Sequence, residues 1–244
     1  MTALFPTVAQ AIAQDELCAV VTALRGPAVG RKIFVRADGA SCGSLGDAAV
    51  NAAAVEQAQA AMQARSSARI DLPVGDTSWD LLLDVHTPQE VLVIVGAVHI
   101  AIPLVRFAKE LGLRTVVVDA RTAFATPARF AHADELILRW PADVLAEMAL
   151  NESAYVVTLT HDEKLDTPAL IAALARPVAY VGALGSRRTH AKRVAALEEA
   201  GVSPGQIERI HAPIGLDLGG RSPEEIALSI IAEIVQVRNR GGRK

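Results

Sequence analysis

The sequence is poor in cysteine, in aromatic residues and in excess charge of either sign. Of its 244 residues only Cys18 and Cys42 are cysteines, which predicts a reducing, cytoplasmic environment and argues against an iron–sulfur cluster or zinc knuckle. With 4% aromatic residues and a net charge of −3, we expect no nucleic-acid partner. No apolar run nears the roughly 18 residues of a membrane span, and residues 1–14 do not resemble a signal peptide.

The central stretch, residues 91–119, reads as one strand–helix–strand unit. Residues 91–95 are all apolar and mostly β-branched, as in a strand buried on both faces. Gly96 permits a sharp turn into an amphipathic helix that ends near Gly112, and residues 114–118 supply a second buried strand before Asp119. Such a unit predicts an α/β fold with a Rossmann-like parallel sheet flanked by helices, and a ligand crevice beyond the carboxyl ends of its strands.

The dinucleotide fingerprint in this unit is incomplete. Gly96 and Asp119 occupy the first glycine position and the acidic position that follow from the Gly-x-Gly-x-x-Gly pattern, but Val98 replaces the second glycine. The branched side chain of Val98 stands where a pyrophosphate would approach the backbone. The unit therefore suits another phosphate ligand as well as it suits NAD(P).

The rest of the chain divides into a smaller N-terminal part and a continuation of the sheet. We expect a small α+β domain over residues 1–85 and the Rossmann-like domain over residues 86–244. The Asp38-Gly39 pair predicts a hairpin, and the stretch 66–88, which contains prolines and a glycine, is the expected join, although 79–86 could pair as a strand. Further strands are expected at 135–138, 154–159 and 178–182, and helices at 141–150, 167–175, 186–200, 203–210 and from 222 onward.

A basic helix start is the most informative polar feature. Gly182 and Gly185 lead from a buried strand to Ser186, an expected helix cap. Arg187 and Arg188 then open a first turn that continues with further cations. Cations at this end oppose the helix dipole, at a cost of about 0.3–1 kcal/mol each when exposed. A bound phosphate would reverse that cost; the alternative is a solvated basic face paired with acidic residues elsewhere.

Polar side chains also follow the other strands. His99 comes after the first strand of the central unit, and His161 and Asp162 follow the strand near 154–159, so all three should lie at one edge of the sheet. Each alone is explained as a capping or surface residue, and nothing fixes their mutual spacing, so no metal site is predicted. The glycine-rich segment 211–220 could close over a ligand through Asp217, or serve as a plain connector.

Six segments follow one another in a fixed order: Gly96-Ala-Val-His99, Val118-Asp-Ala-Arg121, Phe124-Ala-Thr-Pro-Ala-Arg-Phe130, Leu159-Thr-His-Asp162, Gly182-Ala-Leu-Gly-Ser-Arg-Arg188 and His211-Ala-Pro-Ile-Gly-Leu-Asp217. Together they resemble the XdhC/CoxI family. The N-terminal part resembles that family's smaller domain through residues 36–39 and 43–46. Two departures stand out: Val98 replaces a glycine, and residues 46–51 lack the cysteine of the Gly-Gly-Cys-x-Glu segment that many members carry.

The resemblance implies a homodimeric accessory protein that carries molybdenum cofactor (molybdopterin) as bound cargo to an apo-molybdenum hydroxylase of the xanthine or CO dehydrogenase type. This would be a chaperone rather than a catalyst. The alternatives from the residues themselves are an NAD(P)-dependent oxidoreductase that uses Asp119 on the ribose, and a non-catalytic nucleotide-sensing module. The expected cofactor-binding residues are Gly96, Val98, His99, Asp119, Arg121, His161, Asp162, Gly182, Gly185, Ser186, Arg187, Arg188 and Asp217.

Overall fold

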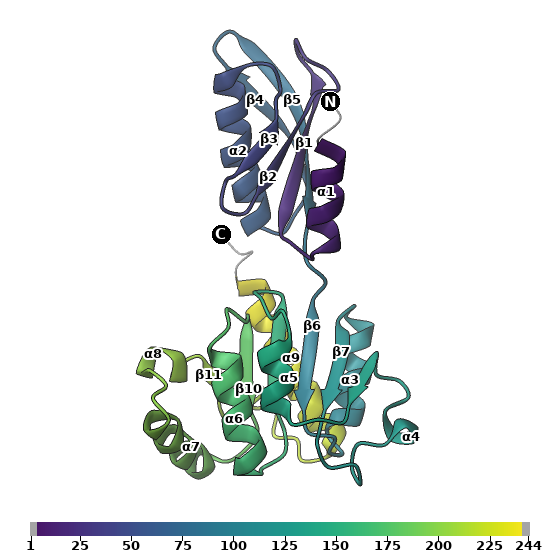
Figure 1. The fold of residues 1–244 in the computed structure, drawn as a ribbon, viewed down its shortest axis with the longest axis vertical. Helices are drawn as coiled ribbons and strands as arrows, with labels where there is room; N and C mark the ends of the chain where they lie inside the picture. The colour runs from purple at the N-terminus through teal and green to yellow at the C-terminus, as the bar shows by residue number, and fades with distance from the viewer. Residues whose placement is uncertain (1–3, 241–244) are drawn as a thin grey trace. The chain divides into compact units, whose positions relative to one another are not determined.

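The computed structural model describes residues 4–240, which form two compact units, residues 4–88 and Gln89–Arg240 (Figure 1). The N-terminal unit is an antiparallel five-stranded sheet in the order β3-β2-β1-β5-β4, with α1 and α2 packed on its opposite faces. An α+β fold of this kind was expected. Its elements are α1 (Leu4–Ala13), β1 (Cys18–Arg25), β2 (Lys32–Arg36), β3 (Ser41–Gly43), α2 (Ala48–Gln63), β4 (Ala68–Val74) and β5 (Thr77–His86).

The stretch 66–88 was predicted to join the domains, and most of it does not: it forms β4 and β5, a hairpin whose pairs run from Ala68 with Leu83 to Val74 with Thr77. The alternative, that 79–86 pairs as a strand, is confirmed, and the boundary between the two units lies at the end of the stretch, between Pro88 and Gln89. Pro73 is tolerated because β4 lies at the edge of the sheet, where a missing N–H breaks no ladder. Gly75, at φ +58°, belongs to the turn between the two strands. The Asp38-Gly39 hairpin is confirmed, with Gly39 at φ +87° between β2 and β3.

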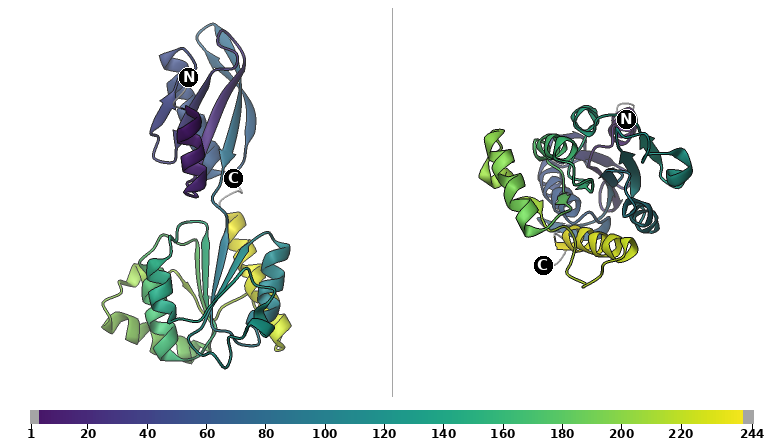
Figure 2. Two further views of the ribbon diagram at one scale, coloured as in Figure 1. Left: turned by 45° about the vertical axis from the view of Figure 1, so that its right-hand side comes forward. Right: turned by 90° about the horizontal axis from the view of Figure 1, so that it is seen from below.

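The second unit is a parallel six-stranded sheet covered by helices on both faces, as the Rossmann-like prediction required. Helices α3 and α9 cover one face, and α5, α6 and α7 cover the other (Figure 2). The elements are β6 (Val91–Val95), α3 (Ala101–Glu110), β7 (Arg114–Val118), α4 (Pro127–Phe130), β8 (Glu135–Ile137), α5 (Pro141–Glu147), β9 (Ala154–Thr158), α6 (Glu163–Leu174), β10 (Tyr180–Ala183), α7 (Arg187–Glu199), α8 (Pro204–Ile207), β11 (Ile210–His211) and α9 (Pro223–Arg240).

The strand order β11-β10-β9-β6-β7-β8 contains one reversal of direction, between β6 and β9. The chain adds β7 and β8 on one side of β6, and then returns to add β9, β10 and β11 on the other. In open α/β sheets, the carboxyl ends of the strands at such a reversal flank the ligand crevice. Two differences from the predicted elements affect this edge: α6 begins at Glu163, earlier than expected, and the helix expected over 203–210 is the short α8 followed by β11.

Candidate functional site

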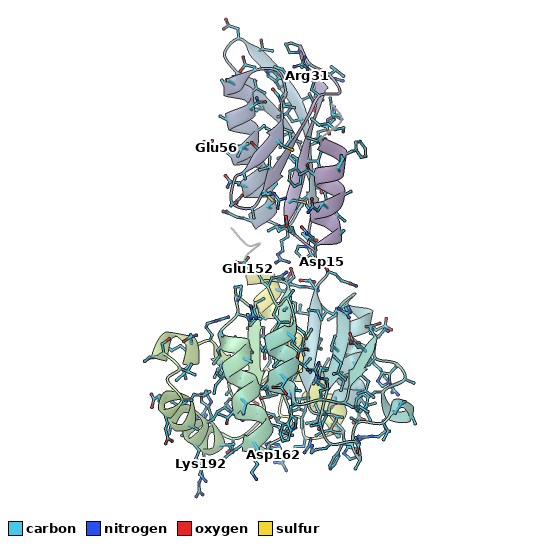
Figure 3. All side chains as sticks on the ribbon, in the orientation of Figure 1. Asp15, Arg31, Glu56, Glu152, Asp162 and Lys192 are labelled. Atoms are coloured by element: carbon cyan, nitrogen blue, oxygen red, sulfur yellow. The ribbon has the colours of Figure 1, made fainter. Side chains whose placement is uncertain are left out.

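The loops that follow β6, β7, β9, β10 and β11 gather at the carboxyl edge of the parallel sheet. Figure 3 shows the labelled side chains of Asp162 and Lys192 at this end of the C-terminal unit. At the strand reversal the loops after β6 and β9 touch, because a Cβ added to Gly96 would lie 2.6 Å from Cγ2 of Thr160. Gly96 is therefore required by the packing of two loops, at φ +111°.

The side chain of Asp119, at the end of β7, holds the turn after β6 through hydrogen bonds. Oδ2 of Asp119 accepts hydrogen bonds from the backbone N–H of Ala97 at 2.8 Å and from Nη2 of Arg121 at 2.8 Å. Oδ1 accepts from the backbone N–H and the Nε of Arg121, both at 2.9 Å. The side chain of Asp119 is fully buried, so this carboxylate is a brace between two loops.

Four donors fill the four acceptor positions that a carboxylate offers. Burial alone would raise the pKa of Asp119, but the hydrogen bonds from Arg121 and from the two backbone N–H groups outweigh it, so the pKa is lowered. A ribose diol could bind Asp119 only by displacing one of these donors. The acidic residue that most favoured NAD(P) in the sequence, Asp119, is thus already hydrogen-bonded within the protein.

Other side chains around this turn also face the protein. Arg129 donates to the backbone carbonyls of Ala97, at 3.0 Å, and of Phe124, and the guanidinium of Arg121 lies 4.6 Å from the centre of the Phe124 ring. Val98 packs against the core between the sheet and α3. His99 is exposed in the turn before α3, so it is the one residue of the Gly96–His99 segment with a side chain available at the surface.

The loop after β9 presents His161 to solvent in an unusual backbone conformation. His161 adopts φ +60°, a left-handed value that a non-glycine residue reaches only at some cost in free energy. On either side, Thr160 accepts from the backbone N–H of Asp162 at 3.0 Å, and Asp162 caps α6 by accepting from Lys164 N at 3.0 Å. Asp162 is therefore a helix cap, and His161 is an exposed residue at the edge of the sheet, as expected for each of them alone.

The loop after β10 opens α7 as the sequence predicted, with Ser186 accepting from the backbone N–H of Thr189 at 3.2 Å. Gly182 has a packing role, because a Cβ there would lie 2.5 Å from Cδ1 of Ile214. Arg187 and Arg188 are exposed, and within residues 4–240 neither is paired with an acidic side chain. Of the alternative, a solvated basic face paired with acidic residues, these two arginines show the exposure but not the pairing.

A cavity of about 570 Å³ opens at the same edge, beside β10 and β11. It brings together Arg187 and Asp217, which are thirty positions apart. Arg188, His99 and His161 are not among its lining residues. The lining is Leu184, Arg187, Pro213, Ile214, Gly215, Leu216, Asp217, Leu218, Gly219, Gly220, Arg221, Glu225, Ile226 and Ser229.

The charges of the cavity leave it receptive to an anion. Glu225 accepts from the backbone N–H groups of Arg221 at 2.8 Å and Ser222 at 3.0 Å, and these bonds lower its pKa. It forms a capping box with Ser222 at the start of α9, so its negative charge stabilises the end of that helix. The other charged side chains of the cavity lining are the cations Arg187 and Arg221 and the single anion Asp217.

Profiles of known families match most of the chain. The XdhC Rossmann domain matches residues 92–234, and the XdhC and CoxI family matches residues 11–72. The chain belongs to the XdhC/CoxI family. The first match covers the parallel sheet together with every loop of its carboxyl edge, so the cavity lies within the XdhC Rossmann domain.

Curated relatives of this XdhC-family chain agree with the match. Identity is 29% with the uncharacterized protein YqeB of Escherichia coli, over 85% of this chain and 40% of YqeB. It is 31% with a protein of Bacillus subtilis named as a probable component of xanthine dehydrogenase, over 72% of this chain and 51% of that protein, and 26% with the molybdenum cofactor insertion chaperone PaoD of E. coli, over 86% and 78%. The chain thus spans about half or less of the first two relatives.

A solved structure shares the fold. A crystal structure of a protein described as a xanthine dehydrogenase, from Bacillus halodurans, superposes with a TM-score of 0.55 at 21% identity and covers 96% of both chains. At that identity the likeness concerns the fold alone. In residues 4–240 of the XdhC-family chain, no helix is long and apolar enough to cross a membrane, and no cluster of three or more His, Cys, Asp or Glu could hold a metal ion.

A hydrogen-bond network anchors the cavity loop of the XdhC domain, and sequence reasoning missed it. Glu233 of α9 accepts from the Tyr180 hydroxyl at 2.5 Å and from the Gly215 N–H at 2.8 Å, and contacts Nδ1 of His211 at 3.0 Å. Burial would raise the pKa of Glu233, but these hydrogen bonds lower it overall. The only signal in the sequence was a glutamate on the otherwise apolar face of the last helix.

The smaller domain contains a second hollow, of about 370 Å³. Its lining includes Pro27 and Ala28, Leu45 and Gly46, together with Arg31 and Trp79. Gly26 lies against the ring of Trp79, and a Cβ at Gly46 would lie 3.0 Å from Nη1 of Arg31. Turn geometry and close packing account for both glycines.

Proposed function

We propose that this chain is an accessory protein that binds molybdenum cofactor as cargo and assists its insertion into a molybdenum hydroxylase of the xanthine dehydrogenase type. The family match and the relative named as a molybdenum cofactor insertion chaperone support a role in maturing that cofactor. The client enzyme, the bound state and the transfer step belong to the proposal, because the chain spans only part of its first two relatives.

The observation that carries the proposal is the cavity beside β10 and β11. Its volume, about 570 Å³, falls in the range of roughly 300–1,000 Å³ that small-molecule sites occupy. The phosphate of the pterin would lie against Arg187, Arg221 and the N-terminal turn of α7, where the guanidinium groups and the free N–H groups both donate. Asp217 would accept from the polar edge of the ring system.

The other expected site residues take supporting places in the same proposal. Asp119 and Arg121 hold the turn after β6, and Gly182 and Gly185 leave room for neighbouring segments. At the rim of the crevice the ligand would meet the exposed side chains of His99, His161 and Arg188, and the helix caps of Asp162 and Ser186.

An NAD(P)-dependent oxidoreductase is the less favoured function. It requires the carboxylate of Asp119 for the ribose, and four donors within the protein already occupy that carboxylate. It also requires close approach of a pyrophosphate to the backbone at Val98, whose side chain is branched. A nucleotide-sensing module differs from the chaperone in one respect: it would bind its ligand without transferring it to an apo-hydroxylase.

The test is a titration of the purified protein with molybdenum cofactor, NAD(H), NADP(H) and a mononucleotide, followed by incubation with an apo-hydroxylase. The proposal predicts that molybdenum cofactor binds most tightly and that the loaded protein activates the hydroxylase. Turnover of a pyridine nucleotide would instead establish the oxidoreductase. Binding of a nucleotide without transfer would establish the sensor.

The homodimer and the cytoplasmic location are parts of the same proposal. Sedimentation of the protein with and without molybdenum cofactor tests the first. Fractionation of cells that express the protein tests the second. A monomer at working concentration would remove the dimer from the proposal and leave the site intact.

A further inference from the structure

Two neighbouring loops of the crevice are each held by a buried charged side chain from the helix that follows. In the loop after β9, the Thr160 hydroxyl donates to Oδ1 of Asp166, on α6, at 2.6 Å. In the loop after β10, the carbonyl of Leu184 accepts from Nη2 of Arg193, on α7, at 2.9 Å. We call these two contacts braces: in each, a buried side chain of the following helix hydrogen-bonds the loop, and the two side chains carry opposite charges.

Both charged side chains are left with one unused polar atom. Asp166 is 2% exposed and Arg193 is 7% exposed. Among residues 4–240, nothing partners Oδ2 of Asp166, Nη1 of Arg193, the Thr158 hydroxyl or Nδ1 of His190, and these are four of the five buried side-chain atoms in that condition. Leaving such atoms without a partner is costly, so four in one place require an explanation.

The four atoms lie in one region, between the sheet and the two helices. Thr158 is the last residue of β9, beside Ala183 of β10, on the face that α6 and α7 cover. His190 lies one helical turn before Arg193. Asp166 and Arg193 also interact electrostatically, since each shifts the pKa of the other toward the charged form, although burial raises the pKa of Asp166 and lowers that of Arg193 overall.

Each brace sits next to the residue that gives its loop its shape. His161, at φ +60°, follows Thr160, and Gly185, at φ +142°, follows Leu184. A Cβ at Gly185 would lie 3.7 Å from Nη2 of Arg193. The two loops also carry residues of the proposed ligand site, and their spacing would set how a ligand is held across them.

We propose that Asp166 and Arg193 are positioning residues that act as one unit, holding the loops 159–162 and 184–187 at a fixed spacing across the ligand crevice. A single internal water could link them, accepting from Arg193 and donating to Asp166 or Thr158. The alternative is that each brace holds only its own loop. The ligand part of this inference rests on the proposed function, whereas the coupling of the loops does not.

The test compares amide hydrogen exchange in the two loops among the wild-type protein, Asp166→Asn, Arg193→Met and the double variant. Asn at position 166 can still accept from Thr160, so the local brace survives. If the pair acts as one unit, each single variant raises exchange in both loops, by about fivefold or more, and the double variant raises it no further than the larger single effect. Lys192→Met, a change at the exposed neighbour of Arg193, should leave both loops unchanged.

The contrary result is equally specific. If Arg193→Met raises exchange only in 184–187, Asp166→Asn raises it at most in 159–162, and each loop of the double variant shows only the effect of its own single variant, the coupling does not exist. Should Arg193→Met fail to fold, Arg193→Lys retains the charge on a single nitrogen, without the second nitrogen of the guanidinium fork, and is expected to raise exchange in both loops. An effect confined to 184–187 would again exclude coupling.

Affinity for molybdenum cofactor separates this inference from the proposed function. With coupling, the two single variants weaken binding by similar factors and the double variant weakens it no further; multiplied factors would contradict it. If the wild-type protein does not bind the cofactor at all, the proposed function fails. The exchange measurement would still decide whether Asp166 and Arg193 act together.

Discussion

Asp119 and Asp166 are two buried carboxylates that the same fold holds in opposite ways. Asp119 accepts four hydrogen bonds, and these outweigh the effect of burial, so its pKa falls. Asp166 accepts from Thr160, and the effect of burial exceeds that of this contact, so the pKa of Asp166 rises. The carboxylate of Asp119 is therefore a structural anchor, while that of Asp166 keeps one oxygen, Oδ2, without a partner among residues 4–240.

Replacing Asp119 with asparagine should destabilise the protein by about 2–3 kcal/mol at pH 7, because an amide cannot accept from all four donors and leaves Arg121 without its partner. Since the pKa of Asp119 is lowered in the folded state, its contribution is fully present above the unfolded value of about 4 and is lost as the pH falls through the folded value. Urea unfolding at pH 7 and pH 3 measures both. A difference that does not shrink at pH 3 would mean that charge is not the cause.

At the scale of single residues, the sequence predicted which residue types form the start of α7 better than it predicted their burial. Ser186 caps α7 as expected, but the cations of its first turns separate into exposed Arg187 and Arg188 and buried Arg193. Spacing alone could not reveal this, because burial of an arginine depends on what the neighbouring helix supplies. Asp166 gave no signal beyond being an acidic residue in a largely apolar helix.

At the scale of elements, the path from β10 to the cavity loop depends on the absence of a side chain at Gly182. Gly182→Ala would place a methyl group 2.5 Å from Cδ1 of Ile214 and 2.7 Å from Cε1 of Tyr180. We expect a loss of about 1–3 kcal/mol in the free energy of unfolding, measured by thermal or urea denaturation. Gly205→Ala, with nothing within 4 Å of the added atom, is the matched control and should be neutral; equal effects would refute the packing role.

Glu233 holds the start of the cavity loop to α9, and its removal should loosen that loop. Glu233→Gln should cost about 1–2 kcal/mol at pH 7 and speed amide exchange at Gly215. Because the pKa of Glu233 is lowered in the folded state, this contribution is present above roughly pH 4.5 and fades as the pH falls below it. An unchanged exchange rate at Gly215 would show that the loop is held by other contacts.

The elements themselves follow from periodicity where burial is complete. The strand at 91–95, buried between two helical layers, coincides with its predicted range. The hairpin β4-β5 was not fully predicted, because β4 is an edge strand with partly exposed residues and Pro73 within it. Edge strands carry the proline and polar residues that, read alone, indicate a connection.

At the scale of the whole molecule, the two units have separate cores and the candidate site draws on one of them. The described core clusters of residues 4–88 and of Gln89–Arg240 share no member. A fragment of residues 89–244 should therefore unfold in a cooperative transition and retain the affinity of the full chain for molybdenum cofactor within about threefold. Loss of binding in a folded fragment would show that the smaller domain contributes to the site.

The central claim is that the cavity beside β10 and β11 holds the phosphate of the cargo through Arg187. Arg187 lines the cavity, while Lys192, an exposed cation further along α7, does not. Loss of a charged hydrogen bond costs about 1.5–3 kcal/mol, so Arg187→Ala should weaken binding of molybdenum cofactor at least tenfold, and Lys192→Ala should change it less than about twofold. Equal losses in the two variants, or no loss in either, would contradict the claim.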